Sequence, residues 1–347
     1  MPVFQKMALT VALCAAVTIS AAVPQVVAKD GYFAGKTIKI TVPYGPGGTY
    51  DQYSQTFSKH LGEHIPGKPN VIVQHMPGAG GSKAMNWAYN VMPKTGYSLL
   101  NPLDNTVLNQ LMRPEKMRYD ARNFTWLGSS NQTNMMIIIR SDTGVKTWKD
   151  MTKRKNIGAA TGAASYGFII QKLTSRLLNY KLQVVQGYKG SAATTFAVER
   201  GEAELNANNW LTYASRVPQW FKGENPFARV VVQVGVFKDP ALPKTIPMLS
   251  EIIDNPLDKA AVKFIGVAGL LGRGLVLPPN SPKHTIKTLR ASYAKMNADP
   301  AFEAALKKRR LRLIVASGAE IQKTVNDAVN NASKEAVDRA RHLIYGK

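Results

Sequence analysis

A Pro/Gly-rich loop after a short apolar run is the first place where the residue types suit chemistry. In the stretch ITVPYGPGGTYDQYSQTF, residues 40–57, the loop is followed at once by the pattern of an amphipathic helix. Gly45, Gly47 and Gly48 have no side chains that would shield the main-chain N–H groups. The first amides of a helix have no intrahelical acceptor, and the helix dipole adds partial positive charge. The loop therefore predicts a site for an anion.

The same loop lacks the features of nucleotide sites. It contains no G-x-x-x-x-G-K-[ST] sequence, and Tyr50 stands where the dinucleotide pattern G-x-G-x-x-G needs glycine. The loop is therefore better suited to a carboxylate ligand than to a nucleotide. Thr49 would add a hydroxyl donor, and Asp51 would cap the helix or bind a polar part of the ligand. A plain turn, with glycines only for tightness, is the alternative for this loop.

Two loops in the second half of the chain have the same composition. GAATGAASYGF and GYKGSAATTF both place small and hydroxyl residues between a predicted strand and a predicted helix. Lys189 in the second of them would supply a charge-assisted contact. We expect the three loops to face one cleft and to bind one ligand together. The candidate ligand-binding residues are Tyr44, Gly47, Gly48, Thr49, Tyr50, Asp51, Asn105, Thr161, Gly162, Ala163, Ala164, Ser165, Lys189, Gly190 and Asn209.

Strands and helices must bring these loops together. Apolar runs at residues 37–44, 70–76 and 97–103 are typical of strands, and the segments between them have helical spacing. This order predicts a parallel sheet covered by helices, and it begins again at residue 155. We therefore expect an α/β fold of two lobes, each a mixed or parallel sheet flanked by helices. The first lobe would contain residues 29–140 and 265–347, and the second residues 141–264, with ligand bound in the cleft between them.

The first 28 residues have the pattern of a cleaved signal peptide. Lys6 is followed by the apolar run MALTVALCAAVTISAAV and then by the small residues that precede a cleavage site. We expect cleavage after Ala28 and export to the periplasm, and an uncleaved N-terminal anchor is the alternative. Cys14 is the only cysteine of the chain, so the exported part would hold no disulfide and no thiolate.

The formal net charge of +23 favours anionic partners. Most basic residues are scattered, and the one run, KKRRLR at residues 307–312, lies in a helix pattern and is typical of a solvated helix face. No nucleic-acid-binding module is recognisable, and an exported protein is in the wrong compartment for one. We therefore expect a small acidic ligand, without nucleic acid, metal or cofactor.

Several stretches together resemble the Bug family of periplasmic solute receptors, the extracytoplasmic components of tripartite tricarboxylate transporters. They are VPYGPGGTYD, VIVQHMPGAGGSKAMNWAYNVMPKTGYSLL, IIIRSDTGVKTWKDM and YKGSAATTFAVERGEAEL. The family pattern runs V-P-[FY]-x-x-G-G-x-x-D, then v-x-N-[RK]-P-G-A-G-G, then P-x-D-G-Y-x-L, then Y-[KR]-G. Its order and spacing agree with this chain from residue 37 to about residue 205.

The resemblance implies a type II-like periplasmic binding protein fold, in which two lobes hinged by crossing strands close on a carboxylated solute. It implies that main-chain N–H groups of residues 47–51, with residues 161–165 opposite, hold the carboxylate and that no catalysis occurs. It also implies delivery to the membrane permease subunits of a tripartite tricarboxylate-type transporter, although a receptor that feeds a sensor kinase would have the same sequence features. We expect a monomer without a cofactor.

Some positions depart from the family pattern and leave the ligand open. Met76 stands in place of the usual basic residue before P-G-A-G-G, His75 in place of Asn, and Thr95 in place of Asp. The acidic or polar site that usually follows the Y-K-G helix is Asn-Asn-Trp here. The ligand is then an aliphatic or an aromatic acid. Three aromatic residues would stack on an aromatic acid or pack inside the lobes, namely Tyr44, Tyr166 and Trp210.

Two short motifs keep a hydrolase as the alternative function. Ser165 lies in AASYG, which resembles a degraded nucleophile elbow, but only His284 and His342 follow it as possible bases. The sequence HLGEH matches the zinc-binding pattern H-x-x-E-H, and a solvated helix end is its other interpretation. The residues of this second motif are His60, Glu63 and His64.

Overall fold

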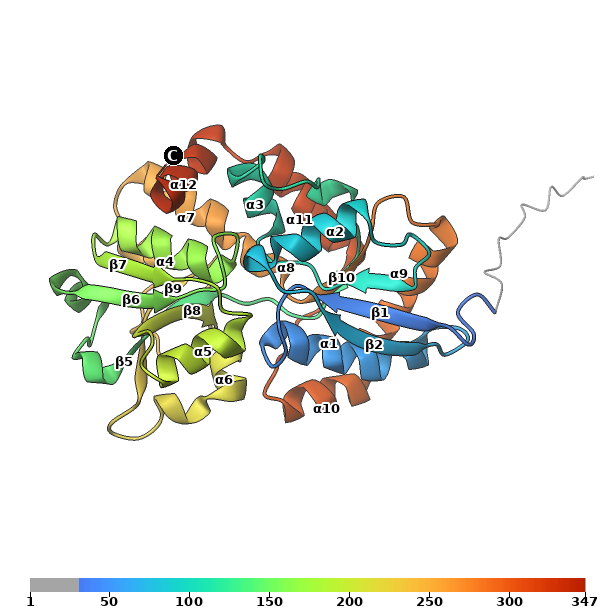
Figure 1. Ribbon diagram of the computed structural model, residues 1–347, viewed down its shortest axis with the longest axis horizontal. Helices are drawn as coiled ribbons and strands as arrows, with labels where there is room; N and C mark the ends of the chain where they lie inside the picture. Colours follow the sequence, from blue (N-terminus) through green and yellow to red (C-terminus); the bar gives the residue numbers. More distant parts are fainter. Residues whose placement is uncertain (1–30, 347) are drawn as a thin grey trace, which may run out of the picture.

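The computed structural model describes residues 31–346, so the predicted signal peptide lies outside the described residues. Two α/β lobes lie side by side, and each is built on its own sheet (Figure 1). The expected α/β class with two sheets flanked by helices is confirmed. Within residues 31–346, no helix combines the length and the apolar character needed to cross a membrane.

The first lobe holds a six-stranded sheet in the order β11-β4-β10-β3-β1-β2. β1, β2 and β3 are parallel, as the β-α-β-α-β pattern predicts, whereas β10 and β11 pair antiparallel with their neighbours. The antiparallel strands come from the C-terminal part of the chain, which returns to complete this sheet. The strands are β1 (Thr37–Val42), β2 (Asn70–His75), β3 (Ser98–Leu100), β4 (Thr125–Ser129), β10 (Gly274–Leu277) and β11 (Ala316–Ser317).

Helices cover both faces of this sheet because its strands are apolar on both sides. One core joins Phe57, Leu289 and Phe302, from three helices, to Ile38 and Ile40 of β1. A second core, on the other face, is built from the remaining helices. The helices of the first core are α1 (Thr49–His60), α9 (Lys283–Asn297) and α10 (Pro300–Lys308), and those of the second are α2 (Ser82–Asn90), α3 (Thr106–Met112) and α11 (Gly318–Asn330).

The second lobe holds a five-stranded sheet in the order β7-β6-β8-β5-β9. The central strand β5 is buried on both faces, since Ile137 and Ile139 pack in one core and Met136 and Ile138 in the other. This explains the nearly unbroken apolar run NMMIIIR. The strands are β5 (Met135–Arg140), β6 (Lys155–Ala159), β7 (Lys181–Val185), β8 (Leu205–Asn209) and β9 (Ala228–Val234).

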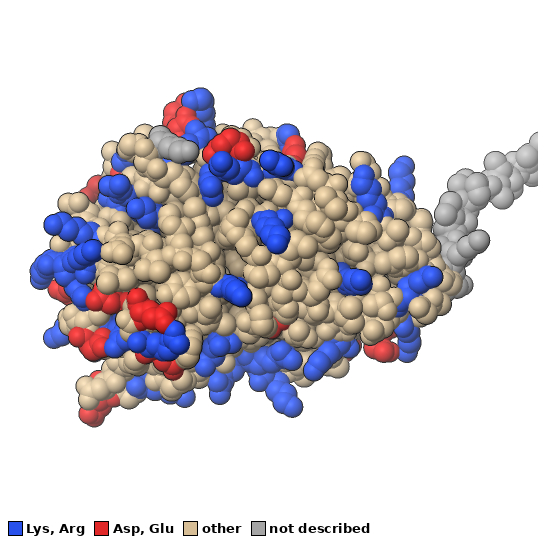
Figure 2. Space-filling model, in the orientation of Figure 1, with Lys and Arg blue, Asp and Glu red and all other residues tan. Residues whose placement is uncertain are grey.

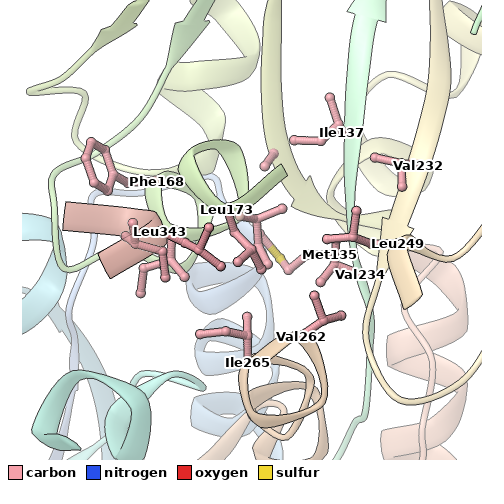
Figure 3. Packing of buried hydrophobic residues seen from close by; sticks show 14 of the residues in the cluster. Met135, Ile137, Phe168, Leu173, Val232, Val234, Leu249, Val262, Ile265 and Leu343 are labelled. Carbon is pink, nitrogen blue, oxygen red and sulfur yellow. The ribbon is translucent and has the colours of Figure 1, made fainter. Parts of the chain in front are cut away.

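The C-terminal helix packs on the second lobe. Leu343 lies in one core with Leu173 and Ile265, so three helices cover one face of the sheet (Figure 3). These are α4 (Tyr166–Leu177), α7 (Pro256–Gly266) and α12 (Lys334–Tyr345); α5 (Ser191–Glu199) and α6 (Trp210–Arg216) cover the other face, and α8 (Ala268–Leu271) leads back to the first lobe. Short 3-10 helices lie at Leu61–His64, Ala79–Gly81, Ala121–Asn123, Ser141–Thr143, Trp148–Lys153, Pro218–Phe221 and Leu249–Glu251.

Two features differ from the expected division of the chain. β5 is part of the second sheet, so this lobe begins at Met135 and not after residue 140. α12 packs against α4 and α7, and therefore the last helix belongs to the second lobe and not to the first. The physical reason is that its apolar face completes the core over β5 and β9. The chain consequently crosses between the lobes three times.

Candidate functional site

A cavity of ≈ 50 Å³ lies between the two lobes. That volume holds a few water molecules, because one needs roughly 10–15 Å³. The first lobe contributes the ends of its strands and the beginning of α1, and the second contributes the beginnings of α4, α5 and α6. Its lining residues are Tyr44, Thr49, Tyr50, Asp104 and Arg273 from the first lobe and Met135, Ala159, Ala160, Thr161, Ser165, Tyr166, Gly167, Ser191, Thr194, Ala207, Asn208, Asn209 and Thr212 from the second.

Two of the helices that begin at the cavity have no side-chain cap. α1 begins after Gly48 and α5 after Gly190, and neither N-cap residue provides a hydrogen bond from a side chain. The first amides of both helices are therefore not satisfied by an N-cap side chain, and amides in this position are suited to an anion. Both helices are long enough to carry a dipole, and Thr49 and Ser191 at their first positions line the cavity.

The other two helices cap themselves. Ser165 Oγ accepts from the amide of Phe168 at 3.3 Å and donates to the carbonyl of Gly162 at 2.7 Å. Asn209 Oδ1 accepts from the amide of Thr212 at 3.0 Å. The expected pair of open helix beginnings was residues 47–51 with residues 161–165. That pair stays a prediction, and the structure adds α5 in the third loop, whose beginning lies opposite that of α1 and has no side-chain cap.

The lobes touch through main-chain and amide groups around this cavity. The amide of Gly45 donates to the carbonyl of Lys189 at 2.5 Å. Asn105 Nδ2 donates to the carbonyl of Ala164 at 2.8 Å, and Asn109 Nδ2 donates to the same carbonyl at 2.9 Å. The structure therefore has a closed cleft, in which first-lobe donors bind second-lobe carbonyls.

Glycines allow a second close approach at the mouth of the cleft. A Cβ on Gly80 would lie 2.6 Å from the amide nitrogen of Ser165, and one on Gly162 would lie 2.8 Å from the amide nitrogen of Gly80. Both glycines have positive φ values, 68° and 157°. The P-G-A-G-G loop thus meets the second lobe backbone to backbone. The side chain of Lys189 is exposed and lies beside this mouth, outside the inner cavity.

A buried ion pair forms part of the cavity wall. Arg273 Nη1 lies 2.9 Å from Asp104 Oδ2, and the two side chains are only 3% and 5% exposed. The guanidinium carbon lies 3.7 Å from the centre of the Tyr50 ring, and Nη2 donates to Thr49 Oγ1 at 3.3 Å. Desolvation opposes the charge of Arg273, but Tyr50 and Asp104 outweigh it and raise its pKa. The sequence predicted main-chain amides as the binding groups, and this pair adds two charged side chains to the cavity wall.

Three tyrosines keep neutral hydroxyls at the site. Burial raises the pKa of Tyr44, Tyr50 and Tyr166, and the charge of Asp104 adds to the effect. The Tyr50 hydroxyl accepts from the amide of Asp104 at 2.8 Å, and the Tyr166 hydroxyl donates to the carbonyl of Ile265 at 2.9 Å. Trp210, by contrast, packs against Phe221 with 5.2 Å between ring centres and does not line the cavity.

Six of the predicted site residues line the cavity: Tyr44, Thr49, Tyr50, Thr161, Ser165 and Asn209. The others form the contacts around it. Asp51 stabilises its own loop, since Oδ2 accepts from the amide of Gly47 at 2.7 Å and Oδ1 lies 2.8 Å from His75 Nε2. Ala163 packs against the core of the second lobe, and its carbonyl accepts from the Tyr345 hydroxyl at 3.0 Å. The remaining residues, which hold the closed lobes together, are Gly47, Gly48, Asn105, Gly162, Ala164, Lys189 and Gly190.

Sequence reasoning missed Arg273 altogether. Its signal was a single basic residue in the apolar stretch LLGRGLVL, but nothing local connects it to Asp104, 169 residues away. Ser191 and Thr194 lie in the third loop, which the sequence did single out. Their spacing, i and i+3 at the beginning of a helix, places both on the face that meets the cavity.

The alternative hydrolase motifs are not assembled into active sites. Ser165 Oγ is engaged in its helix cap, and no histidine lines the cavity among the described residues. His64 lies 3.1 Å from Asp299, and Glu63 pairs with Lys68 at 2.9 Å. Across residues 31–346, no three His, Cys, Asp or Glu side chains gather where they would hold a metal ion.

Comparison with known proteins finds similarity in structure but not in sequence. No protein-family model and no curated protein matches this chain. The solved periplasmic binding protein BugD matches with a TM-score of 0.71 and 17% identity, over 89% of this chain and 97% of BugD. A protein of R. palustris solved with adipate matches with a TM-score of 0.68 and 17% identity, over 88% of this chain and 97% of that one. MatC from Rhodopseudomonas palustris, with bound malate, matches with a TM-score of 0.68 and 16% identity, over 89% of this chain and 99% of MatC.

These comparisons define the fold of the chain. It has the two-lobed fold of periplasmic binding proteins, with the cavity between the lobes. More particularly, its neighbours are Bug- and TctC-type binding proteins, so the resemblance read from the sequence motifs is confirmed at the level of the fold.

Proposed function

We propose that this protein is a periplasmic solute receptor of the Bug type. It captures a small carboxylated solute in the interlobe cleft and passes it to the permease subunits of a tripartite tricarboxylate-type transporter. The observation that carries the proposal is the pair of uncapped helices, α1 and α5, which begin at one cavity from opposite lobes. The adipate and malate bound to two structural neighbours support a carboxylate as the ligand class.

Binding proceeds by closure. In the open form the solute carboxylate meets the amides at the beginning of α1 and the hydroxyl of Thr49. The second lobe then brings the beginning of α5, and the contacts of Gly45 with Lys189 and of Asn105 with Ala164 form. The positive field of the protein speeds the encounter with an anion. No bond of the solute is made or broken, so the protein acts as a receptor and not as an enzyme.

A thermal-shift screen of mono-, di- and tricarboxylates tests this proposal. A ligand that binds only the native state at a hundredfold excess over Kd stabilises it by about 2.7 kcal/mol, enough to raise the melting temperature by several degrees. We expect at least one small carboxylate to do so, and an uncharged alcohol of the same carbon skeleton to have no effect. If no carboxylate moves the midpoint, the proposed ligand class is wrong.

A further inference from the structure

The charges in the cavity balance, although those of the protein do not. The chain carries a net charge of +23, and Lys and Arg side chains lie over both lobes of the face in Figure 2. Among the lining residues, however, Asp104 and Arg273 alone are charged, and they are bonded to each other. The cavity therefore presents one positive and one negative group at the same place.

Arg273 has donor capacity that the protein leaves unused. Its Nε is buried and has no hydrogen-bond acceptor among the described residues. Its Nη2 makes a long contact of 3.3 Å with Thr49 Oγ1. A buried cationic donor without an acceptor is costly, so this edge of the guanidinium is suited to a ligand carboxylate. Thr49, which accepts from Nη2, is the first residue of the uncapped helix α1, so the beginning of this helix favours the same negative charge beside the guanidinium.

The carboxylate of Asp104 also has hydrogen-bond acceptor positions that the protein leaves unused. Its Oδ2 accepts from Arg273 Nη1 at 2.9 Å, and its Oδ1 accepts from the amide of Asn105 at 3.0 Å. A carboxylate offers about four acceptor positions, so two remain for a guest. Asp104 lines the cavity, and its charge adds to the effect of burial in raising the pKa of Tyr44. A ligand cation would bind favourably there, whereas a second ligand carboxylate would be repelled.

On the basis of the proposed receptor function, we propose that the ligand is a small amphoteric acid, with a carboxylate and a cationic nitrogen close together, as in an α-amino acid. The carboxylate binds at Arg273 and the beginnings of α1 and α5, and the ammonium binds at Asp104. The two charged groups of an α-amino acid sit on one carbon, which suits protein charges 2.9 Å apart. A polycarboxylate would bring uncompensated negative charge beside the buried Asp104. The small volume of the closed cavity also favours a ligand of few atoms.

Isothermal titration calorimetry with two matched pairs tests this inference. L-alanine and propionate differ by the ammonium group, and so do L-aspartate and succinate. We expect the amino compound of at least one pair to bind tenfold or more tightly than its partner. Asp104→Asn keeps the shape of the side chain but removes its charge, and it should abolish that preference. Asp120→Asn removes the same charge from a carboxylate that pairs with Arg122 outside the cavity, and it should keep the preference.

The outcomes separate this inference from the receptor function. If propionate or succinate binds as tightly as its amino partner, or if only a larger carboxylate binds, the amphoteric ligand is wrong while the receptor function stands. If no carboxylate of any kind binds, both are wrong. The wild-type pairs decide the matter even if Asp104→Asn fails to fold.

Discussion

Gly48 and Ser191 bring the beginnings of two helices from different lobes together. A Cβ on Gly48 would lie 2.5 Å from Ser191 Oγ, 3.7 Å from the Ser191 amide nitrogen and 3.8 Å from that of Ala192. Glycine at position 48 therefore keeps the amides of α1 and α5 open to the same small space. This relationship underlies the proposed site, because each helix alone offers only half of it.

Gly48→Val should abolish ligand binding and leave the protein folded. Rotation of the Ser191 hydroxyl would relieve the contact of the Cβ, but the two valine methyl groups would cover the amides of α5. The φ of Gly48 is −78°, which valine adopts without strain. Gly31→Val is the matched control, since nothing lies within 4 Å of a Cβ there. Calorimetry and circular dichroism of both variants check this, and unchanged affinity in Gly48→Val would contradict the site.

Gly80→Ala should prevent full closure of the cleft. The added Cβ would lie 2.6 Å from the amide nitrogen of Ser165, a backbone atom that cannot rotate away. Gly144→Ala is the control, because its φ of 76° has a similar backbone cost of about 1 kcal/mol but its Cβ meets nothing within 4 Å. Small-angle scattering with saturating ligand should show compaction of the control and not of Gly80→Ala. Equal compaction of both would show that this contact does not limit closure.

Arg312→Ala should destabilise the protein by about 3–5 kcal/mol, because it leaves the fully buried Asp239 unpaired. The guanidinium binds both carboxylate oxygens, at 2.7 and 3.0 Å, and the pair joins the first lobe to the segment after β9. The run KKRRLR is therefore not solvated throughout. Lys307→Ala in the same run breaks an exposed pair with Glu303 and should cost at most about 0.5 kcal/mol. Urea unfolding compares the two, and similar losses would argue against the buried pair.

Tyr345→Phe should make the protein less sensitive to alkali. Burial raises the pKa of Tyr345 from 10.0 to about 12. A raised pKa contributes stability that is complete below pH 10 and is lost as the pH rises towards 12. Phenylalanine cannot ionise, so the free energy of unfolding should fall less steeply between pH 10 and 12 in the variant. At pH 7 the variant should be less stable by about 1 kcal/mol, because the hydrogen bond to Ala163 is lost. Parallel alkaline slopes would contradict the assignment.

Local patterns in the sequence predicted where strands and helices form. Long-range packing decided which lobe each of them belongs to. The strands at Thr37–Val42 and Asn70–His75 follow from apolar runs bounded by turn residues. α12 has a helical pattern too, but its lobe depends on contacts with α4 and α7, which no nearby residue reveals.

The candidate site likewise has features that the sequence predicted and features that it did not. Glycine and hydroxyl residues marked the three loops, and these loops do surround one cavity. The sequence could not predict which helices lack a side-chain cap at their first amides. That depends on whether the side chains of Ser165 and Asn209 cap their own helices. The pairing of Arg273 with Asp104 was also not predictable, because the two residues are 169 positions apart and only the pairing of β3 with β10 brings them together.

The most direct measurement is a crystal structure of the protein with the tightest carboxylate found in the screen. The account predicts that the ligand carboxylate lies between the beginnings of α1 and α5, about 3 Å from at least one amide nitrogen of each helix. A ligand bound outside the cavity, or one whose carboxylate touches a single lobe, would contradict it.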